Sequence, residues 1–153
     1  MKIVIHQSKT CRGLAFLIDE SDNRVNAKKV FDELPEKQSV KRERELRTRF
    51  DYWLDDKVHD KWFHGWPNNK KYKNCFVFKW KHRRLQHRIY GFLCNPKMDD
   101  PRYQLCVLVS HAKKNEWETN PPDLDRIVEI SNEKSVKLAI KKLFPKKQRG
   151  KKK

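Results

Sequence analysis

Three short apolar runs follow one another in the middle of the chain, and they constrain the fold more than any other feature. They span residues 74–80, 86–94 and 103–110 and are rich in the aromatic and β-branched residues that favour strands. Both intervening links are short enough for hairpins, and the second contains two prolines and two aspartates that are typical of turns. The sequence therefore predicts three antiparallel strands, and the almost continuous apolar run at 103–110 is typical of a central strand covered on both faces.

The flanking segments predict further strands and several helices. Apolar pieces at 3–5 and 14–18 predict two strands around a turn at Arg12-Gly13, followed by a loop over 19–26. A helix with one apolar stripe is predicted from Lys37 to Trp62, because apolar residues recur there at steps of three and four, at Val40, Leu46, Phe50, Trp53, Leu54 and Val58. A turn-rich loop at 64–71 ends this helix, and two more helices are expected at 122–130 and 133–144, before Pro145.

The order of these elements predicts the α+β class. We expect a small antiparallel sheet of about four strands, with a mixed edge and with helices packed on one face. Residues 1–144 are predicted to form a single domain with an N-terminal extension, and residues 145–153 to form a disordered basic tail.

The charge balance points to a polyanionic partner. The chain has 37 Lys and Arg against 20 Asp and Glu, a formal net charge of +17. This excess of charge is typical of disorder, but five Trp, eight Phe and four Tyr supply large surfaces that can be buried. The last 13 residues contain eight basic side chains and no acidic one. The tail either binds phosphates or serves only as a solvated end.

Other patterns argue against membrane insertion and metal binding. No apolar run approaches the ~20 residues of a membrane helix, and the first residues lack the pattern of a secretory signal. The four cysteines are far apart and show no spacing typical of zinc ligands. We therefore expect a cytoplasmic protein with reduced cysteines, no metal, no cofactor and no membrane partner.

A basic segment with an aromatic residue inside it joins the first two middle strands. It reads Lys79-Trp80-Lys81-His82-Arg83-Arg84, and cations beside an aromatic ring suit phosphates and bases together. Trp80 either stacks on bases or is buried, as most tryptophans are. The predicted RNA-binding residues are Lys79, Trp80, Lys81, Arg83, Arg84 and Lys114.

Between Phe76 and Val128 the chain resembles the RelE/HigB-like toxins, in particular their phage-derived HigB-like branch. The resemblance covers about a third of the chain and is carried by four segments: Phe76–Trp80, Arg88–Leu93, Leu105–Lys114, and Thr119 with the Pro-led helix that follows. It implies a RelE-like fold and an endoribonuclease that cleaves messenger RNA, either free or on the ribosome. It also implies a small antitoxin protein as partner.

Cleavage of RNA by attack of its own 2′-hydroxyl needs a general base, cations around the phosphate and a proton donor for the leaving oxygen, but no metal. Arg88 offers a bidentate fork to a phosphate, and Lys113 follows the last middle strand. His111 and Tyr90 are the predicted acid or base, since histidine titrates near neutrality. The predicted catalytic set is Arg88, His111, Tyr90 and Lys113, and His87 is a weaker candidate that we expect to be solvated.

Each of these residues also has a purely structural interpretation. Arg88 fits an exposed charge at the start of a strand, His111 a hydrogen-bonding cap, and Tyr90 a core residue. A second function of a different class is therefore a non-catalytic nucleic-acid-binding protein, of phage or mobile-element origin, on the same scaffold. A ribosome-associated basic protein is a third interpretation, and it depends on the tail alone.

Overall fold

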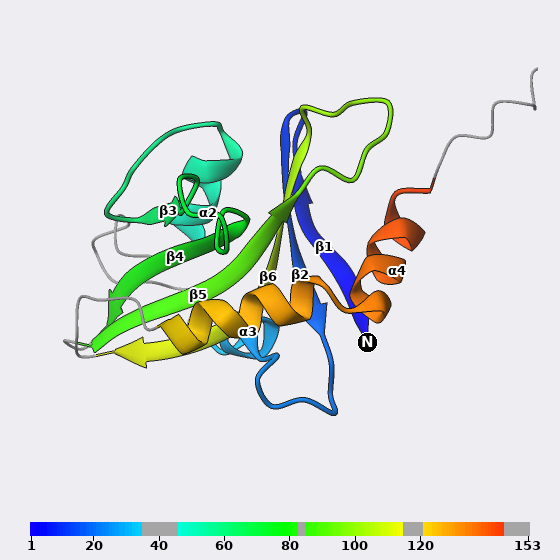
Figure 1. Cartoon of the computed structure of the whole chain (residues 1–153). Helices are drawn as coiled ribbons and strands as arrows, with labels where there is room; N and C mark the ends of the chain where they lie inside the picture. The colour runs from blue at the N-terminus through cyan, green and yellow to red at the C-terminus, as the bar shows by residue number, and fades with distance from the viewer. Residues whose placement is uncertain (35–45, 83–84, 115–120, 146–153) are drawn as a thin grey trace, which may run out of the picture.

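A six-stranded mixed sheet forms the centre of the protein (Figure 1). The computed structural model describes residues 1–34, 46–82, 85–114 and 121–145. The strand order is β1-β2-β6-β5-β4-β3, and neighbouring strands are antiparallel except for the parallel pair β2 and β6. The strands are β1 (Lys2–Ser8), β2 (Arg12–Ile18), β3 (Phe63–Gly65), β4 (Cys75–His82), β5 (Leu85–Cys94) and β6 (Gln104–Lys114).

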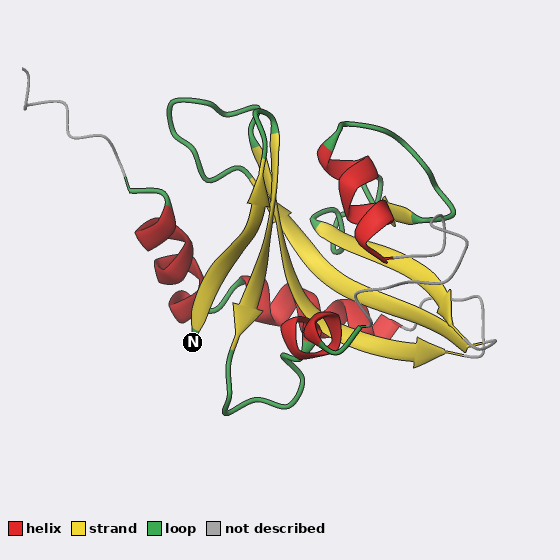
Figure 2. Ribbon diagram, turned by 180° about the vertical axis from the view of Figure 1, so that it is seen from behind, coloured by secondary structure: helices red, strands yellow, loops and turns green. Residues whose placement is uncertain are grey.

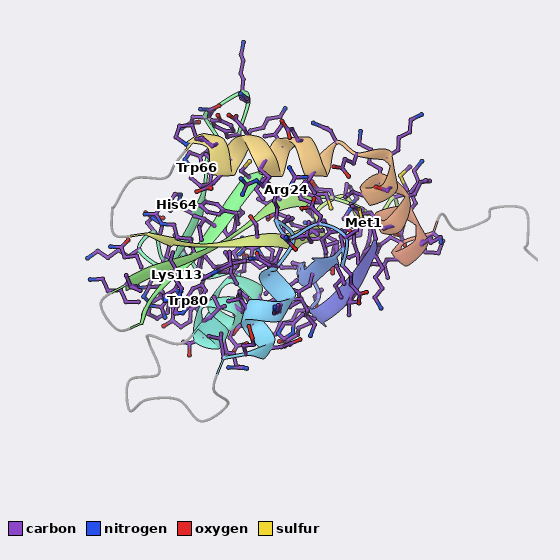
Figure 3. The ribbon with its side chains drawn as sticks, turned by 90° about the horizontal axis from the view of Figure 1, so that it is seen from below. Met1, Arg24, His64, Trp66, Trp80 and Lys113 are labelled. Atoms are coloured by element: carbon purple, nitrogen blue, oxygen red, sulfur yellow. The ribbon has the colours of Figure 1, made fainter. Side chains whose placement is uncertain are left out.

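Helices cover both faces of this sheet (Figures 2 and 3). Helices α1 (Ala27–Asp32) and α2 (Leu46–Leu54) pack on one face, and α3 (Pro121–Ser131) and α4 (Lys134–Leu143) pack on the other. Successive side chains of a strand point to opposite faces, so each middle strand contributes to two cores. In β4, for example, Phe76 and Phe78 pack with α2, whereas Val77 packs with α3. We call these the α1/α2 face and the α3/α4 face.

The α+β class and the three middle antiparallel strands are confirmed, and two finer predictions are wrong. The sheet has six strands rather than about four, and the helices lie on both faces rather than on one. The reason for the second difference is that β4, β5 and β6 are apolar on both faces, so each face has to be shielded from water.

The helix expected from Lys37 to Trp62 ends earlier in the structure than predicted. Its described part is α2, which ends at Leu54, while residues 35–45 lie outside the described residues. Asp56 has a positive φ of 63° just after the helix, and Val58, which was expected on the apolar stripe, is 80% exposed. Residues 63–65, placed partly in a loop by the sequence, form the edge strand β3, and α1 was not predicted.

A β-bulge in β6 changes which face its last residues occupy. Tyr90 pairs with Ser110 but Gly91 pairs with Leu108, so Val109 is an extra residue on β6. Asn26, just before α1, holds this bulge from the side. Its backbone N–H donates to the carbonyl of Val109 (3.0 Å), and its side-chain oxygen accepts from the backbone N–H of His111 (2.8 Å). Beyond the bulge, His111 therefore lies on the α1/α2 face.

Gly91 permits a close approach of β5 to β6 at the same place. A Cβ atom at this position would overlap the carbonyl oxygen of Val107. The absence of a side chain thus lets the two strands stay paired across the bulge.

Candidate functional site

Two histidines on adjacent strands contact each other on the α1/α2 face. Nδ1 of His87 on β5 lies 2.9 Å from Nε2 of His111 on β6, which is hydrogen-bond distance. The two rings are roughly parallel, with centroids 5.2 Å apart. One proton lies between these nitrogens, so one ring donates and the other accepts. The pair is half-buried, which leaves part of it open to solvent.

Strand pairing places Trp80 and Lys113 beside this histidine pair. Both residues lie directly opposite His87, Trp80 on β4 and Lys113 on β6, and opposite residues of an antiparallel pair share a face. The Trp80 ring is stacked on His87 at 5.1 Å and lies 5.8 Å from His111. Trp80 is only 6% exposed, whereas Lys113 is exposed (Figure 3). The pair therefore rests on a buried indole and has a lysine at its solvent side.

The surroundings keep His111 uncharged at neutral pH. Burial, together with the positive charges of His87 and Lys113, lowers the pKa of His111 to about 4. A histidine with so low a pKa is a neutral hydrogen-bonding group under physiological conditions. The arrangement thus combines a neutral imidazole, a second imidazole bonded to it and a cation on the same face.

A second cationic cluster lies on the α3/α4 face. Arg88 is 1% exposed and lies opposite Lys79 on β4. The pKa of Lys79 is lowered by burial and by Arg88, and the pKa of His64 is lowered chiefly by burial, with smaller effects from both cations. Tyr90, also 1% exposed, lies on this face, and its hydroxyl has no hydrogen-bond partner among the described residues. The sheet separates this cluster from the histidine pair.

The structure brings together only part of the predicted catalytic set. His111, Lys113 and Trp80 lie on the α1/α2 face, whereas Arg88 and Tyr90 lie on the α3/α4 face with Lys79. The bulge is the physical reason. In a regular strand His111 would share the face of Leu105, Val107 and Val109, and therefore that of Tyr90. A catalytic role for Arg88 and Tyr90 remains a prediction.

Of the other predicted RNA-binding residues, the structure describes the side chain of Lys81. Lys81 is exposed near the end of β4. Lys114 is the last residue of β6, but its side chain lies outside the described residues, as do Arg83 and Arg84. His87 was not placed in the predicted catalytic set. A signal for His87 was present in the sequence. His87 lies near the start of one predicted strand and His111 follows the end of the next, and these positions lie at the same end of two antiparallel strands.

The described ranges hold neither a metal-type cluster nor a membrane-spanning helix. No three or more His, Cys, Asp or Glu side chains lie together there as a metal ion would require. No helix in this part of the chain is both long and apolar enough to cross a membrane. All four cysteines are free, and burial raises the pKa of Cys75 to about 11 and of Cys94 to about 12. These two thiols are therefore poor nucleophiles.

Comparison of the chain with protein-family models, curated proteins and solved structures finds no match. What the structure defines is an α+β protein with a six-stranded mixed sheet and a histidine pair at one end of it. Membership of the RelE/HigB-like toxins remains a prediction from the sequence.

Proposed function

We propose that the protein is an endoribonuclease that cleaves messenger RNA, free or on the ribosome, without a metal ion. The observation that carries this proposal is the 2.9 Å contact between His87 and His111 beside exposed Lys113. Two imidazoles and a cation supply the three functions that cleavage by the 2′-hydroxyl needs. The net charge of +17 supports a polyanionic substrate.

The reaction would run as an internal transfer at phosphorus. The 2′-oxygen attacks the adjacent phosphorus, the bond from phosphorus to the 5′-oxygen breaks, and a 2′,3′-cyclic phosphate and a 5′-hydroxyl form. The histidine pair takes the proton of the 2′-hydroxyl and returns a proton to the leaving 5′-oxygen, so protons balance. His111 is neutral and can therefore accept a proton, and Lys113 stabilises the charge on the phosphate oxygens.

The toxin assignment is part of the same proposal and is supported by the sequence resemblance. A messenger-RNA nuclease of this kind needs a partner that neutralises it, and we propose a small antitoxin protein. Expression without that partner is then expected to arrest bacterial growth.

The test compares His87→Ala, His111→Ala and the double variant with His64→Ala, a half-buried histidine on the opposite face. Each site variant should slow cleavage of a fluorogenic RNA by about 10²- to 10⁴-fold, the usual contribution of general acid–base catalysis. The double variant should be about as slow as the slower single variant, because the two rings act as one unit. His64→Ala should cleave at close to the unmodified rate.

Two results would contradict the proposal. One is cleavage at the unmodified rate by a folded double variant. The other is loss of free-RNA cleavage in EDTA together with recovery on addition of a divalent ion. Growth arrest that persists in the double variant would show that toxicity does not depend on the histidine pair.

A non-catalytic nucleic-acid-binding protein is the second candidate. The half-buried state of both histidines favours it, because a substrate has to reach the pair between flanking side chains. In that case the protein would bind RNA with a strong salt dependence and release no cyclic phosphate.

A further inference from the structure

Three aromatic side chains gather where α2 ends and the following segment leads to β3. They are Tyr52, His59 and Trp62, which we call the aromatic patch; all three are half-exposed. The rings of His59 and Trp62 are parallel, with centroids 4.0 Å apart and an interplanar angle of 5°. Tyr52 meets Trp62 edge-on at 4.8 Å. The turn that contains His59 and Trp62 is closed by backbone N–H groups of Trp62 and Phe63, which donate to the carbonyl of His59, whereas Tyr52 lies in α2.

Two cations contact rings of the aromatic patch, and the exposed Asp60 lies between His59 and Lys61 in the chain. The ammonium of Lys57 lies 4.7 Å from the centre of the Tyr52 ring, and the guanidinium of Arg49 lies 4.6 Å from that of Trp62. Lys57 and Lys61 are exposed. Proteins that bind single strands without reading sequence combine aromatic rings for the bases with cations for the backbone. The patch offers both groups at one place.

The patch and the histidine pair lie on the same face of the sheet. Tyr52 and Trp62 pack against the α1/α2 core, which also contains Trp80. The backbone N–H of Lys79 donates to the carbonyl of Trp62 (2.7 Å), so the patch adjoins β4 next to Trp80, which stacks on His87. At ~4.8 Å between neighbouring strands, about 14 Å separates the line of β3 from that of β6. A short single strand would span this distance.

Neither core packing nor a protein partner accounts as well for the patch. Packing alone explains the buried sides of Tyr52 and Trp62, but not a stack that leaves three aromatic rings half-exposed among lysines. A protein partner that used an apolar surface would meet the positive charges of Lys57 and Lys61 there. A polyanion is attracted by the same charges, and a protein of net charge +17 favours it overall.

We propose that the aromatic patch is a base-stacking subsite for single-stranded RNA, which guides the strand toward the His87–His111 pair. The inference rests on the proposed function for the identity of its ligand. The chemistry of the patch differs from that of the histidine pair, because stacking depends on ring faces and not on proton transfer.

The experiment measures binding of an oligomer that cannot be cleaved. A fluorescent 2′-O-methyl uridine oligomer lacks the attacking hydroxyl, so anisotropy reports affinity alone. His59→Ala and Trp62→Leu are each expected to weaken binding about five-fold or more, the equivalent of ~1 kcal/mol for one stacked base. The matched controls are His64→Ala and Trp66→Leu, whose rings contact each other at 4.8 Å on the opposite face; both should bind within two-fold of the unmodified protein.

An abasic oligomer of the same length identifies stacking as the cause. The unmodified protein should bind it more weakly than the uridine oligomer, whereas the patch variants should bind both oligomers alike. Thermal unfolding of each variant establishes that it is folded, and Tyr52→Leu provides a third patch variant if Trp62→Leu does not fold.

The proposal falls if folded patch variants bind like the unmodified protein, if they lose equal affinity for both oligomers, or if the uridine oligomer does not bind. Loss of binding in the patch variants, in a protein that never cleaves RNA, would support the subsite and refute the proposed nuclease. Cleavage that depends on the histidines but not on the patch would support the proposed nuclease and refute the subsite.

Discussion

At the scale of single residues, burial and neighbouring positive charge keep His111 uncharged, and this makes stability depend on pH. The pKa of His111 is about 4 in the folded protein, against 6.5 for an ordinary histidine. Between these values the unfolded chain binds a proton that the folded protein does not. The free energy of unfolding should therefore fall as the pH is lowered from about 6.5 to about 4.

The measurement is urea unfolding of the unmodified protein and of His111→Gln at several pH values in this window. The variant should show a shallower loss of stability on acidification, because glutamine takes up no proton. His6 and His64, whose pKa values are also lowered mainly by burial, remain in both proteins and provide a common background. Parallel curves for the two proteins would show that His111 does not titrate differently on unfolding.

At the scale of secondary-structure elements, the bulge in β6 and its contact with Asn26 determine the position of His111. Replacing Asn26 with Ala removes the oxygen that accepts the His111 backbone N–H. We expect the free energy of unfolding to fall by about 0.5–1.5 kcal/mol, the usual net contribution of one hydrogen bond, because this contact is only partly buried. Cleavage of RNA should fall more than stability alone explains, because the His111 ring would lose its register with His87.

The control for this variant is Asn95→Ala. The side chain of Asn95 likewise bonds the backbone, because its Nδ2 donates to the carbonyls of Pro101 and Tyr103, but it lies in a loop beyond the opposite end of β5. The Asn95→Ala variant should lose about as much stability as Asn26→Ala, but its cleavage of RNA should fall no further than that loss of stability explains. An NMR titration of His111 gives a second measure, since a displaced ring should titrate closer to 6.5. An unchanged His111 titration in Asn26→Ala would contradict the positioning role.

At the scale of the whole molecule, the excess of positive charge extends from the sheet into the C-terminal residues. Deleting residues 146–153 removes six basic residues, and these lie outside the described residues. RNA binding should become weaker and less dependent on salt, because each lost contact with a single strand reduces the slope of log K against log salt by about 0.7. Any base preference should remain, since phosphate contacts do not read sequence.

The test is a titration of both proteins against one RNA at several salt concentrations. Lys2→Ala with Lys97→Ala, two lysines that are part of the described fold and lie away from the histidine pair, provides a control for loss of charge elsewhere. Equal slopes for the full chain and the truncated one would mean that the C-terminal lysines make no contact with RNA.

Local sequence determined most of the secondary structure. The aromatic and β-branched content of residues 75–82, 85–94 and 104–110 predicts their strands, and the three-to-four spacing at 124–143 predicts two helices. Part of the candidate site was also predicted, because His111, Lys113 and Trp80 were chosen from the sequence, whereas His87 was expected to be solvated.

Only the tertiary structure decided which of those residues meet. A strand has a side-chain period of two, so one extra residue at Val109 moves His111 and Lys113 from the face of Arg88 and Tyr90 to the face of Trp80 and His87. That extra residue is held by Asn26, which is 85 positions from His111 in the chain. The residue spacing within β6 does not predict this contact, because the hydrogen bond joins β6 to Asn26 at the start of α1, far away in the chain.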